Sequence, residues 1–538
     1  MHRNKSVDVH RFAMIPKSDI PRSSFRIQKA HKTTMDSGWL VPIYIDEVLP
    51  GDTFNLRMTA FARLATPLFP TMDNLHLESF FFFVPNRLVW RNWVRMMGEQ
   101  ANPTDTTSYT VPQTTSPVGG YPIGSIFDHM GLPTVGQVGA GNTVTHSAMW
   151  LRAYNLIWNE WFRDENLQNP VTFDRTSDGP DPQSDFALLR RGKRKDYFTG
   201  CLPWPQKGDP VQLPLGRAAP VFFGSGTGEP VQGSQEYRTQ LGAPVTGGPL
   251  TLDGSGQLQV NGTNAYLAPG TGQLFADLSQ ATAATINQLR QSFAVQRLLE
   301  RDARGGTRYT EVIRSHFGVL SPDARLQRPE YLGGGSSPIT VNPIAQTSAT
   351  PNAGNETPLG TIGAMGTAVH SGHGFSQSFV EHGMVIGLIM VRADLTYQQG
   401  LRRMWSRKTK YDYYWPAFAH LGEQTVLNKE IYCDGSVQDE NVFGYQERWA
   451  EYRYNPSEIT SLFRSTAAGT LDAWHYAQRF TALPTLAPTF IEERPPLPRT
   501  LAVGSGANGQ ELIVDTFFET IAARPLPMYS VPGLIDHF

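Results

Sequence analysis

The chain has 538 residues, of which 40% are hydrophobic and 11% aromatic, so it can bury a sizeable core. Charged residues make up only 17%, below the roughly 25% typical of soluble proteins, and the formal net charge of −2 excludes a global basic field that would attract nucleic acid. Two cysteines exclude a disulfide framework and fit a reducing cytoplasm, and the absence of a long apolar stretch or a signal-peptide core predicts no membrane insertion.

Residues 1–36 are predicted to form a basic N-terminal arm. Eight lysines and arginines precede Asp36, against two acidic residues. One interpretation is a solvated tail. The other is an arm that neutralises phosphates without reading bases. On the second interpretation the candidate DNA contacts are Arg3, Lys5, Arg11, Lys17, Arg22 and Arg26.

Three apolar runs follow within residues 37–100. In the first, around residues 39–45, apolar side chains recur at every second position. In the second, apolar and polar residues alternate from Phe54 to Leu64, which predicts a half-buried strand. The third run, 75–84, contains four consecutive phenylalanines and predicts a strand covered on both faces. Three strands without an intervening helix predict the first part of an antiparallel sandwich or barrel.

Loop and helix are predicted between residues 101 and 200. Residues 87–100 can begin a helix, and residues 101–144 are rich in Pro, Gly and Thr, which is typical of loops with short strands. Residues 147–167 are the clearest helix, because their apolar residues recur at the spacing of one helix face. We expect this aromatic stripe to lie in a core or a subunit interface rather than in a ligand site.

The segment VPIYIDEVLPGDTFNLRMTAFARLATPLFPTMDN, followed by FFFFVPNRLVW, resembles the major capsid protein of gokushoviruses. The likeness continues at MGEQ (97–100), RAYNLIWNEWFRDENL (152–167) and LPWPQKGD (202–209), and it covers most of the chain. Gokushoviruses are Microviridae, small bacteriophages with circular single-stranded DNA. The resemblance implies a mainly β protein, a single eight-stranded antiparallel jelly roll (viral β-barrel) with long inserted loops and a few α-helices.

Two further basic clusters are candidates for DNA contact. The first, RRGKRK, is either a solvated loop or a phosphate contact on an inner surface; its basic residues are Arg190, Arg191, Lys193, Arg194 and Lys195. The second, LRRMWSRKTKYDYYW, interleaves basic and aromatic residues, a pattern that can hold single-stranded nucleic acid by charge and base stacking but that also occurs at protein interfaces. Its candidate contacts are Arg402, Arg403 and Trp405.

Residues 201–280 are predicted to contain an inserted surface loop. Residues 221–275 are rich in Gly, Pro, Thr and Gln, and long insertions of this kind are usually functional or disordered. The sequence GSGTGEP lacks the ending of a phosphate-binding loop, so we reject that interpretation. The resemblance implies that the insertion forms a protrusion at the three-fold axes, where it would meet a host surface receptor.

Residues 281–538 are predicted to hold a helix, a second loop insertion, the remaining barrel strands and a C-terminal tail. The helix is expected at 282–304, and residues 332–369 are expected to form a low-charge loop. A buried strand is expected within 375–397. The tail, 513–538, mixes an apolar run with Pro and polar residues and could dock onto a neighbouring subunit.

A metal-dependent barrel enzyme is the third-ranked alternative. Its cluster would be His370, His373, Glu381 and His382. The spacing matches neither a cupin barrel nor the zinc motif HExxH. We therefore expect loop or surface histidines, no catalytic constellation, no cofactor and no bound metal.

The preferred hypothesis is a structural, non-enzymatic capsid protein. The resemblance implies self-assembly into a T=1 icosahedral virion shell around the single-stranded DNA genome, assembled in the host bacterial cytoplasm. It also implies a small internal DNA-binding protein and a pilot protein as partners. The alternative from another class is a carbohydrate-binding, lectin-like β-sandwich, which would also expose aromatic-rich loops. Large particles would favour the first hypothesis, and a glycan-binding monomer the second.

Overall fold

The computed structural model describes residues 21–209, 211, 286–347, 360–503 and 511–529, together with short segments between 221 and 276. The chain divides into two compact units. The first combines Met1–Pro205 with Arg301–Phe538, and the second is Gln206–Glu300.

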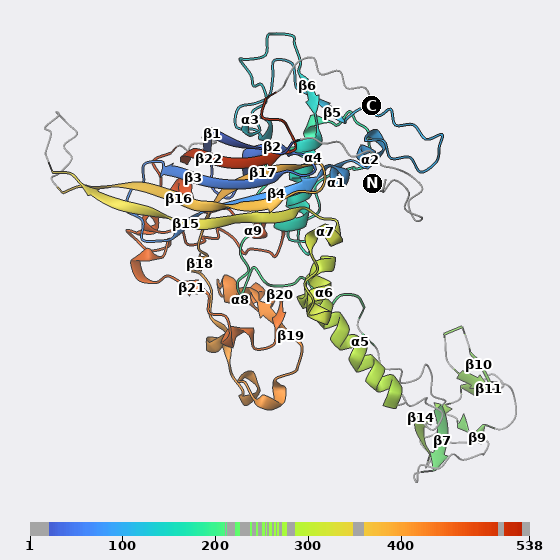
Figure 1. Cartoon of the computed structure of the whole chain (residues 1–538). Coiled ribbons are helices and arrows are strands. Elements are labelled where there is room, and N and C mark those ends of the chain that lie inside the picture. Colours follow the sequence, from blue (N-terminus) through green and yellow to red (C-terminus); the bar gives the residue numbers. More distant parts are fainter. Residues whose placement is uncertain are drawn as a thin grey trace. The chain divides into compact units, whose positions relative to one another are not determined.

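Eight strands of the first unit form one antiparallel sheet (Figure 1). They are β1 (Ser23–Met35), β2 (Val41–Val48), β3 (Thr53–Leu64), β4 (Leu75–Pro85), β15 (Glu330–Ala345), β16 (Ile362–Ser378), β17 (Gly383–Ala393) and β22 (Leu512–Arg524). Their order across the sheet is β1-β22-β3-β16-β15-β4-β17-β2. Along the chain, the first strand pairs with the eighth, the second with the seventh, the third with the sixth and the fourth with the fifth. This nested pairing is that of a jelly roll, so the predicted fold class is confirmed.

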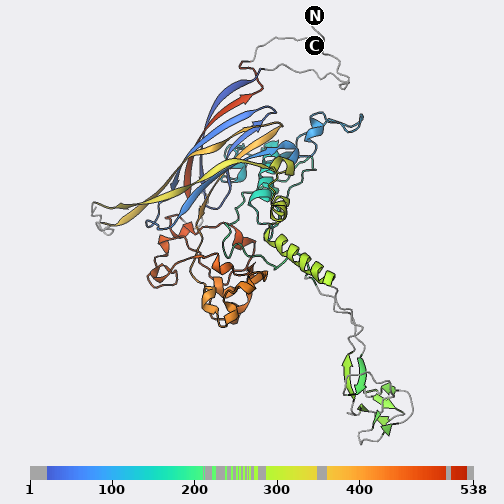
Figure 2. The same ribbon diagram turned by 60° about the horizontal axis from the view of Figure 1, so that its bottom comes forward.

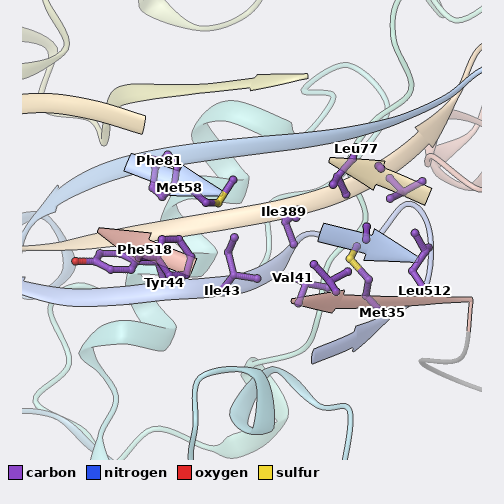
Figure 3. Close-up of a cluster of buried hydrophobic side chains, with 14 of the residues drawn as sticks. Met35, Val41, Ile43, Tyr44, Met58, Leu77, Phe81, Ile389, Leu512 and Phe518 are labelled. Carbon is purple, nitrogen blue, oxygen red and sulfur yellow. The ribbon is translucent and has the colours of Figure 1, made fainter. Parts of the chain in front are cut away.

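The sheet has two halves with different surroundings. We call β1, β22, β3 and β16 the β3 half, and β15, β4, β17 and β2 the β4 half. The inner faces of both halves enclose one core, to which β4 contributes Phe81 and Phe83. Figure 3 shows residues of this core, and in it the rings of Tyr44 and Phe518 lie side by side, with centroids 4.9 Å apart.

Within the β4 half, β2, β4 and β17 are buried on their second face as well. That face packs against the second core, which includes Phe82 and the helix α4 (Met149–Ile157), continued by a π-helical turn at Trp158–Phe162. Successive phenylalanines of β4 therefore enter opposite cores, which explains why a continuous apolar run forms a strand here. The predicted helix at 147–167 is confirmed over these residues. Three short helices lie in the same region, at α1 (Asn86–Val89), α2 (Trp93–Met96) and α3 (Ile126–His129), beside the strand pair β5 (Gln113–Thr115) and β6 (Thr145–Ser147).

Two predictions about the chain ends need correction. Residues 23–35 of the expected arm form β1, and residues 513–524 of the expected docking tail belong to β22. The two strands pair with each other over their whole length, from Ser23 opposite Arg524 to Met35 opposite Leu512 (Figure 2). Local periodicity is weak in β1 because it is an edge strand that is largely exposed. Its partner lies almost 500 residues away, where no local pattern reveals it.

The low-charge loop expected at 332–369 is also wrong for its described residues. Most of it belongs to the long hairpin strands β15 and β16. Low charge suggested a loop, but the segment forms strands whose glycines allow neighbouring groups to approach closely. A Cβ on Gly334 would lie 2.0 Å from the carbonyl oxygen of Ser79, and one on Gly335 would lie 1.9 Å from Nδ1 of His373.

A third core is formed by residues 197–201 together with the segment between β17 and β22. It includes Tyr197, Tyr397 and Ile431. Its short elements are β18 (Thr396–Tyr397), β19 (Glu423–Leu427), α8 (Asn428–Ile431), β20 (Val442–Glu447), β21 (Ser457–Glu458) and α9 (Pro488–Ile491). The two cysteines are free, Cys201 in this core and Cys433 at the surface. None of the helices in the described ranges is long and apolar enough to cross a bilayer.

The second unit contains small sheets. Their strands are β7 (Val221–Ser225), β8 (Tyr237–Arg238), β9 (Pro244–Val245), β10 (Leu250–Leu252), β11 (Leu258–Val260), β12 (Thr263–Asn264), β13 (Tyr266–Leu267) and β14 (Gly272–Ala276). The helix α5 (Ile286–Arg304) begins in this unit and confirms most of the helix predicted at 282–304. The first unit then adds α6 (Tyr309–Phe317) and α7 (Asp323–Leu326).

A substitution at Gly374 tests the close packing of β16 on β3. A Cβ on Gly374 would lie 2.0 Å from the backbone oxygen of Leu56, so one strand would have to move. We expect Gly374→Ala to lower the free energy of unfolding by about 1–3 kcal/mol or more, measured by urea denaturation. Gly363→Ala, on the same strand with its nearest atom 3.8 Å away, is the matched control and should change stability little. Equal effects of the two variants would contradict the packing argument.

Candidate functional site

The outer face of the β3 half is exposed and carries large apolar side chains among polar and charged ones. Buried and exposed residues alternate along β3 and β22, so only the inner face enters the core. The opposite face carries large apolar side chains with exposed fractions of 37% or more: Phe61, Met365, Val369, Ile513, Phe517 and Ile521. We call this surface, with its flanking polar residues, the outer sheet face.

Strand register brings these residues together. Phe61 of β3 lies opposite Val369 of β16 on one side and Asp515 of β22 on the other. Two positions along, Phe517 lies between Thr59 and Ala30. Isolated exposed apolar residues need no explanation, but a contiguous group across several strands is typical of a protein contact surface.

Ion pairs border the apolar residues of the outer sheet face. Lys32 of β1 contacts Asp515 of β22 at 3.1 Å, and Arg26 pairs with Glu519. Both pairs join the edge strand to its neighbour and are well exposed, so each contributes at most about 1 kcal/mol. The charges of each pair cancel locally, and Arg57 and Arg63 of β3 add two exposed cations to the same face.

The basic cluster 190–195 is largely engaged inside the first unit. Arg191 and Arg194 both bind Glu78, whose side chain is 4% exposed and also accepts from Nε of Arg392 at 2.7 Å. Burial by itself would raise the pKa of Glu78, but the hydrogen bond from Arg392 and the three guanidinium charges outweigh it and lower that pKa. A single carboxylate thus joins β4, β17 and the 190–195 segment.

The other residues of this cluster have separate partners. Arg190 stacks on Trp39 at 4.1 Å and donates to backbone oxygens, while Lys193 is buried over the ring of Phe490. Lys195 pairs with Asp164 but keeps 58% of its side chain exposed, and Arg194 keeps 55%. The solvated-loop interpretation is therefore wrong for Lys193, because this lysine is buried. Arg194 and Lys195 are the members that can still meet a partner.

The basic and aromatic segment 402–415 is exposed. Trp405 is 70% exposed, and short 3-10 turns at Arg403–Ser406 and Lys410–Asp412 organise its neighbours. Arg402 reaches Glu458 at 3.4 Å, and Arg403 contacts the buried Glu430 at 3.1 Å. The aromatic residues here are therefore surface groups, and they lie beside cations rather than in a core.

A model of one protein family, described as capsid protein (F protein), matches residues 13–534 of the chain. The chain belongs to this capsid protein family. It is 47% identical over 539 residues to capsid protein VP1 of Bdellovibrio phage phiMH2K and 42% identical over 596 residues to capsid protein VP1 of Chlamydia phage 1. Capsid protein VP1 of Spiroplasma virus 4 is 37% identical over 554 residues. In each comparison 98% of both chains is covered.

Membership of the capsid protein family confirms the resemblance to gokushovirus capsid proteins and gives the chain a structural role in a virion. Capsid proteins assemble into a shell of many subunits, so extensive contact surfaces are needed. The family therefore favours the structural hypothesis over the lectin-like alternative. It also directs attention to surfaces, such as the outer sheet face, rather than to a catalytic cavity.

The basic arm of this capsid protein is only partly described. Arg3, Lys5, Arg11 and Lys17 lie outside the described residues. Arg22 donates to Oγ1 of Thr53, and Arg26 lies on β1. Contact with DNA by any of these residues stays a prediction.

The prediction that His370 and His373 lie in a loop needs correction. His370 and His373 lie on β16, their rings stack at 4.0 Å, and His370 is fully buried. Its Nε2 is 2.8 Å from Oγ of Ser79, and its Nδ1 is 2.8 Å from Oγ of Ser337. Glu381 pairs with Arg87 instead, and among the described residues no three potential ligands form a metal-binding group.

Because His370 is buried, we expect the stability of the folded chain to depend on pH. Burial, together with the neighbouring His373, lowers the pKa of His370 from its ordinary 6.5 to about 4. Between these values the unfolded chain binds a proton that the folded chain does not, so stability falls as the pH falls from about 6.5 to about 4. The slope from this one group is at most about 1.4 kcal/mol per pH unit. His370→Gln should flatten the dependence in urea titrations, and an unchanged slope would contradict the assignment.

Two features of the structure were not predicted from the sequence. Glu78 is a single acid two positions before the first of the four phenylalanines, and an acid within an apolar strand is the signal of a buried ion pair. The outer sheet face was missed because half of it lies on β16 and β22, which were expected to be loop and tail.

Proposed function

We propose that many copies of this chain form a closed icosahedral shell around circular single-stranded DNA, and that they contact one another through the outer sheet face. The observation that carries this proposal is the group of exposed apolar residues on β16, β3 and β22, in which Phe61 lies opposite Val369 and diagonal to Ile513 and Phe517. Strands β2, β4 and β17 have both faces covered within the chain, whereas the β3 half leaves its outer face open. A second copy is the partner that a self-assembling shell supplies.

A charged substitution within the outer sheet face tests the proposal. Val369 is 65% exposed and lies opposite Phe61, so Val369→Asp should leave the subunit folded but place an unpaired charge in the contact. In sedimentation velocity the unchanged protein should form large particles, whereas Val369→Asp should remain as small species with an unaltered unfolding midpoint. Val437→Asp, at a site that is 90% exposed outside the sheet, is the matched control and should assemble normally. Normal assembly of Val369→Asp would contradict the proposed contact.

We expect the enclosed DNA to lie against the exposed basic side chains of the subunit. Arg194, Lys195 and the 402–415 segment supply exposed cations, and the residues of the arm would add more. Phosphate contacts of this kind are independent of sequence and weaken with salt. Nuclease treatment of purified particles tests this step, because a shell around the genome should protect single-stranded DNA. Particles without protected DNA would contradict it.

The insertion at 221–275 is the part of the chain that we expect to contact the host. By resemblance, it forms protrusions at the three-fold axes that meet a host receptor, and the shell also holds a small internal DNA-binding protein and a pilot protein. Low charge over this insertion suits exposure to a host surface rather than to DNA. Deletion of 226–270 should leave assembly intact and abolish adsorption to host cells, and normal adsorption by the deletion particle would contradict this role.

A further inference from the structure

A pocket of about 200 Å³ lies in the first unit between the 402–407 segment and residues 451–459. This volume is below the roughly 300–1,000 Å³ of sites for drug-sized ligands, so it suits a single flat ring rather than a large molecule. Its walls include the side chains of Met404, Arg407, Tyr452 and Tyr454. One wall belongs to the basic and aromatic segment 402–415, for which the sequence suggested contact with single-stranded nucleic acid but no defined pocket.

Arg407 has an unused donor in this pocket. Its side chain is only 10% exposed, its Nη2 donates to Glu451 at 3.3 Å, and its guanidinium lies over Tyr452 at 4.5 Å and Tyr413 at 5.2 Å. Its Nε is buried and has no hydrogen-bond partner. A buried donor without an acceptor is costly, so a ligand that brings an acceptor would stabilise this arrangement.

Rings and cations surround the pocket. Tyr452 and Tyr454 are 53% and 47% exposed, and Trp405 nearby in the chain is 70% exposed. The charged residues that line the pocket are four arginines and three glutamates: Arg402, Arg403, Arg407, Arg464, Glu430, Glu451 and Glu458. Aromatic faces combined with guanidinium groups are how proteins hold unpaired bases and the backbone between them.

We infer that this pocket holds one unpaired base of single-stranded DNA. Nε of Arg407 donates to an acceptor on the base edge, and Arg402, 41% exposed at the same pocket, faces the adjoining phosphate. Flanking bases stack on exposed rings such as Trp405. This inference rests on the proposed function, because it requires that the shell enclose single-stranded DNA. It adds a defined base-binding site to what would otherwise be diffuse charge neutralisation.

Zero-length ultraviolet cross-linking of purified particles tests the inference in the assembled state. Mass spectrometry should find nucleotide adducts on Tyr452, Tyr454 or Trp405. Particles that contain protected DNA but cross-link only elsewhere would overturn this inference and leave the proposed function intact. Particles without DNA would overturn both. Adducts between this pocket and another protein chain would assign it to a subunit contact and also overturn the inference.

Binding by the full-length subunit gives a second readout. We would measure fluorescence anisotropy with a labelled ten-nucleotide deoxythymidine strand and with an abasic strand of equal length. Tyr454→Ala and Arg402→Met, both at exposed side chains, should weaken binding of the base-containing strand by about tenfold to a hundredfold. Tyr309→Ala, an exposed aromatic on α6, is the control and should bind normally. Equal preference of the unchanged protein for both strands would overturn a base-binding pocket.

Discussion

Replacing Glu78 with alanine is expected to lower the free energy of unfolding by about 3–5 kcal/mol. Glu78 is 4% exposed and neutralises Arg392, which is 5% exposed, together with Arg191. Removing the carboxylate leaves the buried guanidinium of Arg392 with Asp394, which is 43% exposed, as its ion-pair partner at 2.6 Å. A loss of this size is expected because a buried charge that loses a buried partner is costly, whereas the intact pair by itself adds little.

The controls separate charge from packing. Glu78→Gln keeps the shape and removes the charge, so it should lose most of the same stability in urea denaturation. Glu519→Ala, which breaks the exposed pair with Arg26, should cost less than about 1 kcal/mol. Because the folded-state pKa of Glu78 is lowered, its contribution is present above its unfolded pKa and is lost as the pH falls through the folded value. A small loss in Glu78→Ala would show that the network is not structural.

Phe518→Ala and Phe517→Ala are expected to have opposite effects on stability and assembly. Phe518 is fully buried, with its ring centroid 4.9 Å from that of Tyr44, so its truncation should cost about 3–5 kcal/mol. Phe517, the preceding residue on β22, faces outward and is 43% exposed. Its truncation should change the unfolding midpoint little but weaken association of subunits.

The adjacent pair is a matched experiment because residue type and strand are the same. Stability would be read from urea denaturation of the subunit and association from sedimentation velocity over a concentration series. If Phe517→Ala destabilised the subunit as much as Phe518→Ala, the outward face would have to be packed within the chain. If it left association unchanged, the outer sheet face would not be a contact between copies.

Strands with a strong local pattern could be predicted from the sequence. The alternation of apolar and polar residues in 54–64 arises because only one face of β3 is buried. The four consecutive phenylalanines occur because both faces of β4 are buried. The helix at 147–167 likewise shows its buried stripe at helical spacing. In each case the information lies within a dozen residues, so periodicity alone is enough.

Other strands could not be predicted because their stabilising partners are distant in the chain. β1 is held by β22, and the glycines of β15 and β16 have meaning only where another backbone passes close to them. The same limit applies to function. The signals of charge and aromaticity at 190–195 and 402–415 were visible, but which side chains are free depends on Glu78, Asp164 and Glu430, which come from other elements.

A cryo-electron-microscopy reconstruction of the assembled particle tests the central claim most directly. If copies associate through the open half of the jelly roll, Phe61, Val369 and Phe517 will each lie against atoms of a neighbouring subunit. A closed shell in which these three side chains face solvent would contradict that claim.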